Sequence, residues 1–199
     1  MQEKKVDRRI QRTKLAIHEA FISLMNEKGF DATQVSDIAE RANINRGTFY
    51  VHYQDKYDLL EKTQTELINQ VQTILLEEDD LNFADIYFVD KPLPIIVTFF
   101  RFMHDNAPLM RALYNFEGGL PFQARIRELI ETNLKIELVF NINNFLVPSE
   151  YLISYAISAH FGVIKDWLEK GCVETPEEMA TIFAKITCYG VLHCTGFTL

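Results

Sequence analysis

Residues 32–53 have the sequence ATQVSDIAERANINRGTFYVHY, whose apolar spacing predicts two short helices joined by a tight turn. In the first helix the apolar side chains recur every three or four residues and share one face: Val35, Ile38, Ala39 and Ala42. In the second helix Phe49 faces inward, whereas the outward side chains are hydrogen-bonding or basic: Asn45, Arg46, Thr48, Tyr50 and His52. A short helix with such a surface, braced by a helix behind it, has the geometry of a helix-turn-helix that reads the DNA major groove.

The region from about Ile10 to Leu60 strongly resembles the N-terminal domain of the TetR family of bacterial transcriptional regulators. The residues that carry the resemblance are Thr33, Asp37-Ile38-Ala39, Ala42-Asn43-Ile44-Asn45-Arg46-Gly47-Thr48-Phe49-Tyr50-Val51-His52-Tyr53, Asp55-Lys56 and Leu59-Leu60. The family commonly has glycine at the turn, where this chain has Asn43. Asparagine tolerates a left-handed backbone better than other non-glycine residues, so we expect the turn to form.

The resemblance also implies which side chains meet DNA. It assigns phosphate contacts to Thr33, Thr48, Tyr50 and Lys56. Asn45 and Arg46 begin the reading helix and are the candidates for base edges, because arginine pairs with guanine and asparagine with adenine. His52 is assigned to either role. An alternative for Tyr50 and His52 is packing against the next helix, and packing is the preferred interpretation for Phe49 and Tyr53.

Charge is distributed unevenly along the chain. Residues 1–60 contain 10 Lys and Arg against 9 Asp and Glu, and the remainder contains 10 against 19, for a net charge of −8. The early basic residues also crowd the start: Lys4, Lys5, Arg8, Arg9, Arg12 and Lys14. An acidic body with a basic end suits a protein that meets a polyanion with that end only.

Composition favours a packed, reduced protein. Of 199 residues, 48% are hydrophobic and 15 are Phe, which indicates a substantial core. No apolar run is long enough to span a bilayer, and the charged N-terminus does not resemble a signal peptide. The odd number of cysteines, three, in a chain without an export signal leads us to expect a cytoplasmic location without membrane partners.

Helical periodicity predominates throughout, so we predict an all-α fold of about nine helices. A three-helix helix-turn-helix domain is expected over residues 1–54, and a larger helical domain for effector binding and dimerisation over 55–199. Gly29 should end the first helix, and Thr33 and Asp55 should be N-caps. Ser149 should cap a helix that Gly171 ends, and Thr175-Pro176-Glu177-Glu178 predicts a capping box for a last helix that reaches His193.

One reading helix makes few contacts, so we expect a homodimer that reads a palindrome. The dimer interface is predicted on the last two helices, at Phe161, Trp167, Phe183 and Tyr189. The stretch from Phe161 to Met179 also resembles, more loosely, the C-terminal domain of one branch of TetR-like regulators. The resemblance places an effector pocket among the middle helices, at Phe99, Phe102, Met103, Met110, Tyr114 and Phe122. The alternative is that these side chains are plain core, and a pocket requires a cavity of roughly 300 Å³ or more.

The sequence predicts a regulator and not an enzyme. It contains no nucleophile–base motif and no glycine-rich phosphate loop, and we predict no cofactor. Cys188, His193 and Cys194 lack the spacing of a metal site, so none is predicted. The leading hypothesis is a DNA-binding repressor that an effector releases. The alternative is a co-regulator that acts through protein or ligand contacts and keeps the head only as scaffold.

Overall fold

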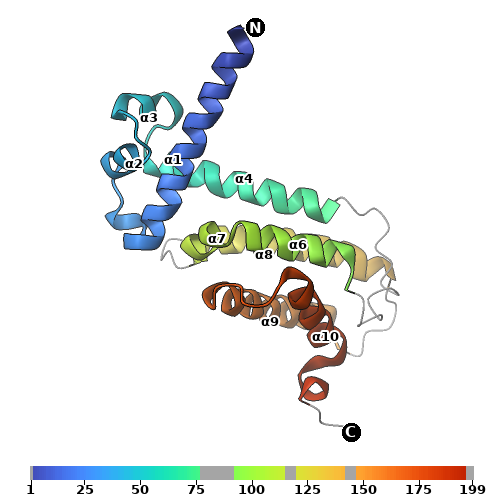
Figure 1. Ribbon diagram of the computed structural model, residues 1–199. Helices are drawn as coiled ribbons and strands as arrows, with labels where there is room; N and C mark the ends of the chain where they lie inside the picture. The colour runs from blue at the N-terminus through green and yellow to red at the C-terminus, as the bar shows by residue number, and fades with distance from the viewer. Residues whose placement is uncertain (1, 77–91, 115–119, 142–146, 196–199) are drawn as a thin grey trace. The chain divides into compact units, whose positions relative to one another are not determined.

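The computed structural model describes residues 2–76, 92–114, 120–141 and 147–195, and within them the protein forms nine helices (Figure 1). The helices are α1 (Gln2–Ala32), α2 (Val35–Arg41), α3 (Arg46–His52), α4 (Lys56–Leu76), α6 (Pro94–Asp105), α7 (Ala107–Tyr114), α8 (Leu120–Asn141), α9 (Ser149–Glu169) and α10 (Pro176–Cys194). The all-α prediction is confirmed. No helix in these ranges combines the length and apolarity needed to cross a bilayer.

The chain forms two compact units. The first comprises Met1–Ile68 and Pro108–Gly119, and the second comprises Asn69–Ala107 and Leu120–Leu199. Nearly all of α7 therefore belongs with the N-terminal helices, and α4 continues from the first unit into the second. The functional division at residues 54 and 55 stays a prediction.

The first unit is built on an aromatic core beneath the helix-turn-helix. Phe21 of α1 and Phe49 of α3 are both fully buried, and Phe21 meets Phe30 edge to face at 6.1 Å. Phe49 packs against Tyr53, which is 8% exposed, with 5.7 Å between ring centres. The preferred interpretation of Phe49 and Tyr53 as core residues is therefore confirmed.

Three local sequence signals at the helix boundaries of this unit act as predicted. Gly29 has a φ of 79° and ends the regular part of α1. Asn43 has a φ of 53°, which gives the turn between α2 and α3 the left-handed residue that it needs. Asp55 caps α4, because its Oδ1 accepts hydrogen bonds from the backbone nitrogens of Tyr57 and Asp58, both at 2.8 Å.

The predicted N-cap of α2 was wrong by one residue. The cap is Gln34, whose backbone nitrogen donates to Asp37 Oδ2 at 2.9 Å. Beyond Gly29 the chain makes one more helical turn, and this turn carries Thr33 into the interior. The Thr33 hydroxyl donates to the carbonyl of Gly29 at 2.7 Å, so it stabilises the end of α1.

The second unit packs α6 against α10 and α8 against α9. Phe100 of α6 is fully buried and meets Trp167 of α9 and Phe183 of α10 edge to face, at 5.4 and 5.5 Å. Trp167 donates its indole N–H to the carbonyl of Glu174 at 3.1 Å. On the surface, Arg101 Nε donates to Glu177 Oε1 at 2.9 Å and ties α6 to α10.

The ends of α9 and α10 required two corrections. Pro148, and not Ser149, is the N-cap of α9, and its carbonyl accepts from the nitrogen of Tyr151 at 3.2 Å. The last helix does not run regularly to His193, because Gly190 adopts a φ of 69°. Two predictions are confirmed: Gly171 follows α9 with a φ of 85°, and Thr175 and Glu178 form the capping box, with Thr175 N donating to Glu178 Oε2 at 2.8 Å.

His160 lies on α9 and contacts α10 with an uncharged ring. Its ring stacks on Phe183 at 4.0 Å, and its Nε2 lies 2.9 Å from the hydroxyl of Thr187. That hydroxyl donates to the carbonyl of Phe183 at 2.7 Å, so Nε2 must be the donor toward Thr187. Burial lowers the pKa of His160 to about 4, which keeps the ring neutral at pH 7.

Candidate nucleic-acid interface

Asn45 is the N-cap of the reading helix α3, and its side-chain oxygen accepts two hydrogen bonds. Asn45 Oδ1 accepts from the nitrogen of Thr48 at 2.7 Å and from its hydroxyl at 3.0 Å. Because both lone pairs of this oxygen are occupied, Asn45 cannot make a bidentate contact with adenine while it caps the helix. Its Nδ2 still has no acceptor among the described residues. Gly47 leaves room for this cap, since a Cβ there would lie only 3.2 Å from Asn45 Oδ1.

Arg46 and Tyr50 lie one turn apart on the exposed side of α3. Tyr50 is 50% exposed, and Arg46 Nη2 lies 3.5 Å from its hydroxyl, which is at the limit of a hydrogen bond. The Tyr50 ring leans edge to face on Phe49, so its hydroxyl stays at the surface. These two side chains keep donors available for a base edge and a phosphate.

Val51 is a surface residue that sequence reasoning missed. It is 78% exposed on α3, although it is large and apolar. The sequence does contain a signal for this exposure, because Val51 follows Gly47 by four residues and therefore lies on the same outer face of the helix. An exposed apolar side chain on a reading helix can contact the methyl group of thymine.

His52 is half-buried at the end of α3. Its ring lies 6.4 Å from that of Tyr53. Burial lowers its pKa, and the nearby charge of Lys14 lowers it further. His52 is therefore neutral at pH 7, and Lys14 of α1 lies close enough to α3 for its charge to act there.

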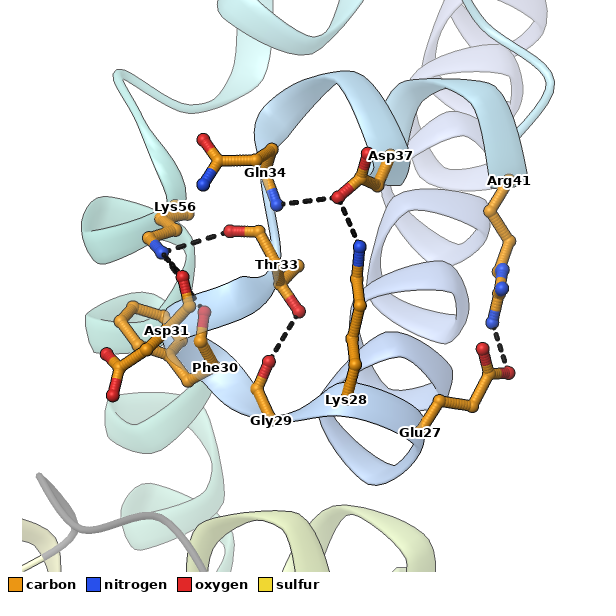
Figure 2. A network of polar contacts seen from close by, with 10 residues as sticks. All are labelled: Glu27, Lys28, Gly29, Phe30, Asp31, Thr33, Gln34, Asp37, Arg41 and Lys56. Atoms are coloured by element: carbon orange, nitrogen blue, oxygen red, sulfur yellow. Dashed lines mark hydrogen bonds and ion pairs between the residues drawn. The ribbon is translucent and has the colours of Figure 1, made fainter.

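Thr33 and Lys56, two of the predicted phosphate contacts, are engaged within the protein (Figure 2). Thr33 is fully buried. The Lys56 ammonium donates to the carbonyl oxygens of Phe30, Asp31 and Thr33 at 3.0, 3.1 and 3.0 Å, which uses all three of its hydrogens. It also lies 4.6 Å from the centre of the Phe30 ring. In this structure both residues position the head and offer no donor to DNA.

Ion pairs fix α2 on the end of α1 (Figure 2). Lys28 Nζ lies 2.6 Å from Asp37 Oδ2, and this contact, with the nitrogen of Gln34, holds the pKa of Asp37 below its usual value. Arg41 pairs with Glu27 and donates to the hydroxyl of Ser23 at 2.8 Å. The described residues include no group of three or more His, Cys, Asp or Glu that could hold a metal ion.

Replacing Lys56 should weaken the fold of the head. In Lys56→Gln the three carbonyls lose a charged donor, and we expect the free energy of unfolding to fall by about 1.5–3 kcal/mol. Urea unfolding measures the change. Lys62→Gln is the matched control, because it removes an equal charge from the same helix at an exposed pair with Asp58, where about 0–1 kcal/mol is expected. Equal losses in the two variants would contradict a structural role for Lys56.

Comparison with known proteins agrees with this geometry. Residues 17–63 match the model of bacterial regulatory proteins of the tetR family, and residues 90–188 match a transcriptional regulator C-terminal region, TetR_C_8. Over 124 residues the chain is 32% identical to YxbF, an HTH-type transcriptional regulator of Bacillus subtilis, covering 60% of this chain and 30% of that protein. Over 63 residues it is 33% identical to IcaR of Staphylococcus epidermidis, a negative regulator of a biofilm operon, covering 32% of this chain and 34% of IcaR. The match to this chain thus spans about a third of the length of each of these two curated relatives.

A solved structure covers more of the chain. A TetR transcriptional regulator from Streptococcus agalactiae is 25% identical, with a TM-score of 0.62, and the match covers 93% of this chain and 98% of that one. The matched proteins are transcriptional regulators, a non-enzymatic class. The two family models together match well over half of the residues. The chain belongs to the TetR family of bacterial transcriptional regulators.

Proposed function

We propose that this protein is a cytoplasmic, homodimeric repressor that binds a palindromic operator through α3 and leaves it when an effector binds. The observation that carries the proposal is the surface of α3, where Arg46, Tyr50 and Val51 are exposed on a helix with a complete cap. A head retained only as scaffold would need no such surface. IcaR is a negative regulator, and its match supports the proposal of repression. The support is limited, because the match covers only about a third of this chain.

The contacts within the structure narrow the predicted set of DNA-binding residues. Arg46 is assigned to a base edge, and the Tyr50 hydroxyl to a phosphate. His52 is neutral and half-buried, so it can donate one hydrogen bond to a phosphate without contributing charge. Thr48 already donates its hydroxyl to Asn45 and would contact DNA only through rearrangement. We leave Thr33 and Lys56 out, because both are engaged inside the head.

Two substitutions on α3 test the reading surface. The DNA is a duplex that the wild-type protein selects from a random-sequence library. Arg46→Ala should weaken binding by roughly 5- to 150-fold and relax the base preference at one position, as loss of a bidentate contact does. Tyr50→Phe should weaken binding to all sequences alike, because a phosphate contact carries no base information. Fluorescence anisotropy on the selected duplex and its single-base variants measures both effects.

Arg125→Ala is the matched control for these substitutions, because it removes an exposed arginine from α8 in the second unit. It should leave affinity and base preference unchanged. If the wild-type protein is folded but selects no duplex, the co-regulator alternative is favoured. The reading role of α3 also fails if the double variant of Arg46 and Tyr50 binds like the wild type.

The proposed dimer surface lies on the exposed faces of α9 and α10. Large apolar or aromatic side chains there are solvent-exposed in the single chain: Tyr151, Leu152, Tyr155, Ile182 and Tyr189. Of the four residues predicted from sequence, Tyr189 is 47% exposed, and Phe161 and Phe183 are half-buried. Trp167 is only 2% exposed and packs in the core of its own chain, so it is not carried into the proposal. A second copy paired through this surface would bury the exposed rings and present two reading heads to half-sites about 34–36 Å apart.

Tyr155→Glu should weaken the dimer. Tyr155 is 61% exposed, and a carboxylate buried at that point would lack a partner. We expect the dimer dissociation constant to rise by roughly 30-fold or more, as measured by analytical ultracentrifugation. Val173→Glu is the control, because it places the same charge on a residue that is 76% exposed in the turn between the two helices. An unchanged dimer in Tyr155→Glu would rule out this surface.

The effector is proposed to be apolar or aromatic. Met103 and Phe122 are buried and Phe99 and Phe102 are half-buried in the second unit, whereas Met110 and Tyr114 belong to the first. Burial raises the pKa of Tyr114 to about 12. An open groove of about 670 Å³ lies elsewhere, along α1 and α7, and none of the six residues lines it.

An effector should lower operator affinity by 5- to 150-fold, the usual range of allosteric coupling. Candidate apolar compounds can be screened for a rise in Tm and then tested for release of the selected duplex. A reporter gene behind that duplex should be expressed more strongly without the protein, and lower expression would contradict repression. For any compound that releases the duplex from the wild type, Phe102→Ala should reduce that release. Equal release from the variant and the wild type would exclude α6 from the effector site.

A further inference from the structure

His18 of α1 is a titratable residue that the proposed reading surface does not use. Its side chain is half-buried, and its Nε2 atom is buried without a hydrogen-bond partner among the described residues. Ile17, next to it, and Phe21, almost one turn further on, are fully buried, so the ring lies at the edge of the core. Buried polar atoms are normally hydrogen-bonded, and an unpaired ring nitrogen therefore requires an explanation.

A second buried polar atom without a partner lies on α4. Thr63 is only 3% exposed, and its hydroxyl has no hydrogen-bond partner within the described ranges. Glu66 follows Thr63 by three residues and so shares its face of α4. The charge of Glu66 acts on the ring of His18, which shows that this face of α4 is turned toward α1. We name the contact around His18, Thr63 and Glu66 the α1–α4 contact.

The charges at this contact do not compensate for the burial of the imidazole. Burial lowers the pKa of His18 below its ordinary value, and the carboxylates of Glu66 on α4 and Glu19 on α1 offset only part of this effect. Glu66 also acts on Tyr53, whose pKa is raised first by burial and then by this charge. The packed form of the α1–α4 contact therefore holds a neutral His18 at pH 7.

The direction of the pKa shift decides how acid acts on this contact. When α1 and α4 move apart at His18, the ring reaches water and its pKa returns toward the ordinary value of 6.5. Between the two pKa values the loosened form binds a proton that the packed form does not bind. A fall in pH through this interval therefore favours the loosened form, by up to about tenfold per pH unit, whereas above the ordinary pKa the contact is insensitive to pH.

The α1–α4 contact lies on a helix that serves both units. The Lys56 ammonium in the first turn of α4 holds the carbonyl oxygens at the end of α1. Beyond Ile68 the same helix belongs to the second unit. Thr63 and Glu66 lie between these two points. A change at His18 therefore acts on the part of α4 that connects the anchor of the head to the rest of the chain.

We propose that the α1–α4 contact is an acid-sensitive switch, which loosens when His18 takes up a proton and thereby lowers the affinity for the operator. The effect on the operator rests on the proposed function, whereas the loosening of the two helices does not. His52 acts in the opposite sense, because a proton on its ring adds positive charge to α3 and strengthens binding to a polyanion. The two histidines can therefore be distinguished by the sign of their effects.

Hydrogen exchange tests the switch without DNA. Exchange of the α1 and α4 amides is compared at pH 7.5 and 5.5, after correction for the intrinsic effect of pH on exchange. In the wild type, the peptides that contain His18 and Glu66 should lose protection by roughly 3- to 10-fold at pH 5.5. His18→Gln is uncharged at both pH values and should show equal protection at both. An equal loss in His18→Gln and the wild type would overturn the switch.

Two further variants keep this test decisive. Glu66→Gln replaces an exposed side chain, so it should fold normally, and it should lower the pKa of His18 as measured by NMR titration of the ring. An unchanged or higher pKa of His18 in Glu66→Gln would contradict the α1–α4 contact. His104→Gln is the matched control, because it removes an exposed histidine from α6 in the second unit, and it should keep the wild-type response to pH.

Fluorescence anisotropy on the selected duplex connects the switch to the operator. His52→Gln is the background for both proteins, so that protonation of α3 does not mask the effect. In this background the affinity should fall by roughly 3- to 10-fold from pH 7.5 to 5.5, and adding His18→Gln should remove the fall. Exchange that responds to pH beside an affinity that does not would refute control of the operator. If the wild type selects no duplex, the proposed function fails, and hydrogen exchange still decides whether the α1–α4 contact responds to acid.

Discussion

The reading head depends on the Lys56 ammonium, which the carbonyl oxygens of Phe30, Asp31 and Thr33 hold at the end of α1. Carbonyls at a helix end have no partner within the helix, and a cation there also complements the helix dipole. This contact fixes the first turn of α4 to the segment that leads into α2. Because α4 continues past Ile68 into the second unit, the helix that anchors the head is shared by both units. A displacement of α4 would therefore be passed to α2 and α3 through Lys56.

The basic residues of the first unit divide according to whether they have a partner. Lys28, Arg41 and Lys56 each have a partner within the protein, and they fix the positions of α1, α2 and α4 relative to one another. Among the described residues, the Arg46 guanidinium has only a long contact with the Tyr50 hydroxyl. Sequence alone shows twelve basic residues in the first unit but not this division, since the fold determines the partner of each cation.

Several features whose partners lie within one turn could be predicted from sequence. Gly29, Asn43, Asp55 and the Thr175–Glu178 box all act over at most four residues, so the chain needs no tertiary information to use them. Local patterns still misplaced the caps of α2 and α9 by one residue each, and they missed the break at Gly190. Sequence could not show which side chains are engaged inside the protein, because distant partners decide this. Lys56 and Phe30 are 26 residues apart, and Trp167 is buried by Phe100 of another helix. Resemblance to the family indicated the face of α3 that is proposed to meet DNA, but not that the Asn45 oxygen is used by the helix cap.

Use of the Asn45 oxygen in the helix cap limits the number of contacts that α3 can make with bases. After capping, α3 keeps few free donors, chiefly the Arg46 guanidinium and the Tyr50 hydroxyl, and Asn45 offers only its amide nitrogen. Two or three contacts can discriminate bases but add little total binding energy, particularly beside a body with nine more acidic than basic residues beyond residue 60. The proposed homodimer offsets this shortage, because a second copy of α3 on the same duplex doubles the number of base contacts without changing which bases each helix reads.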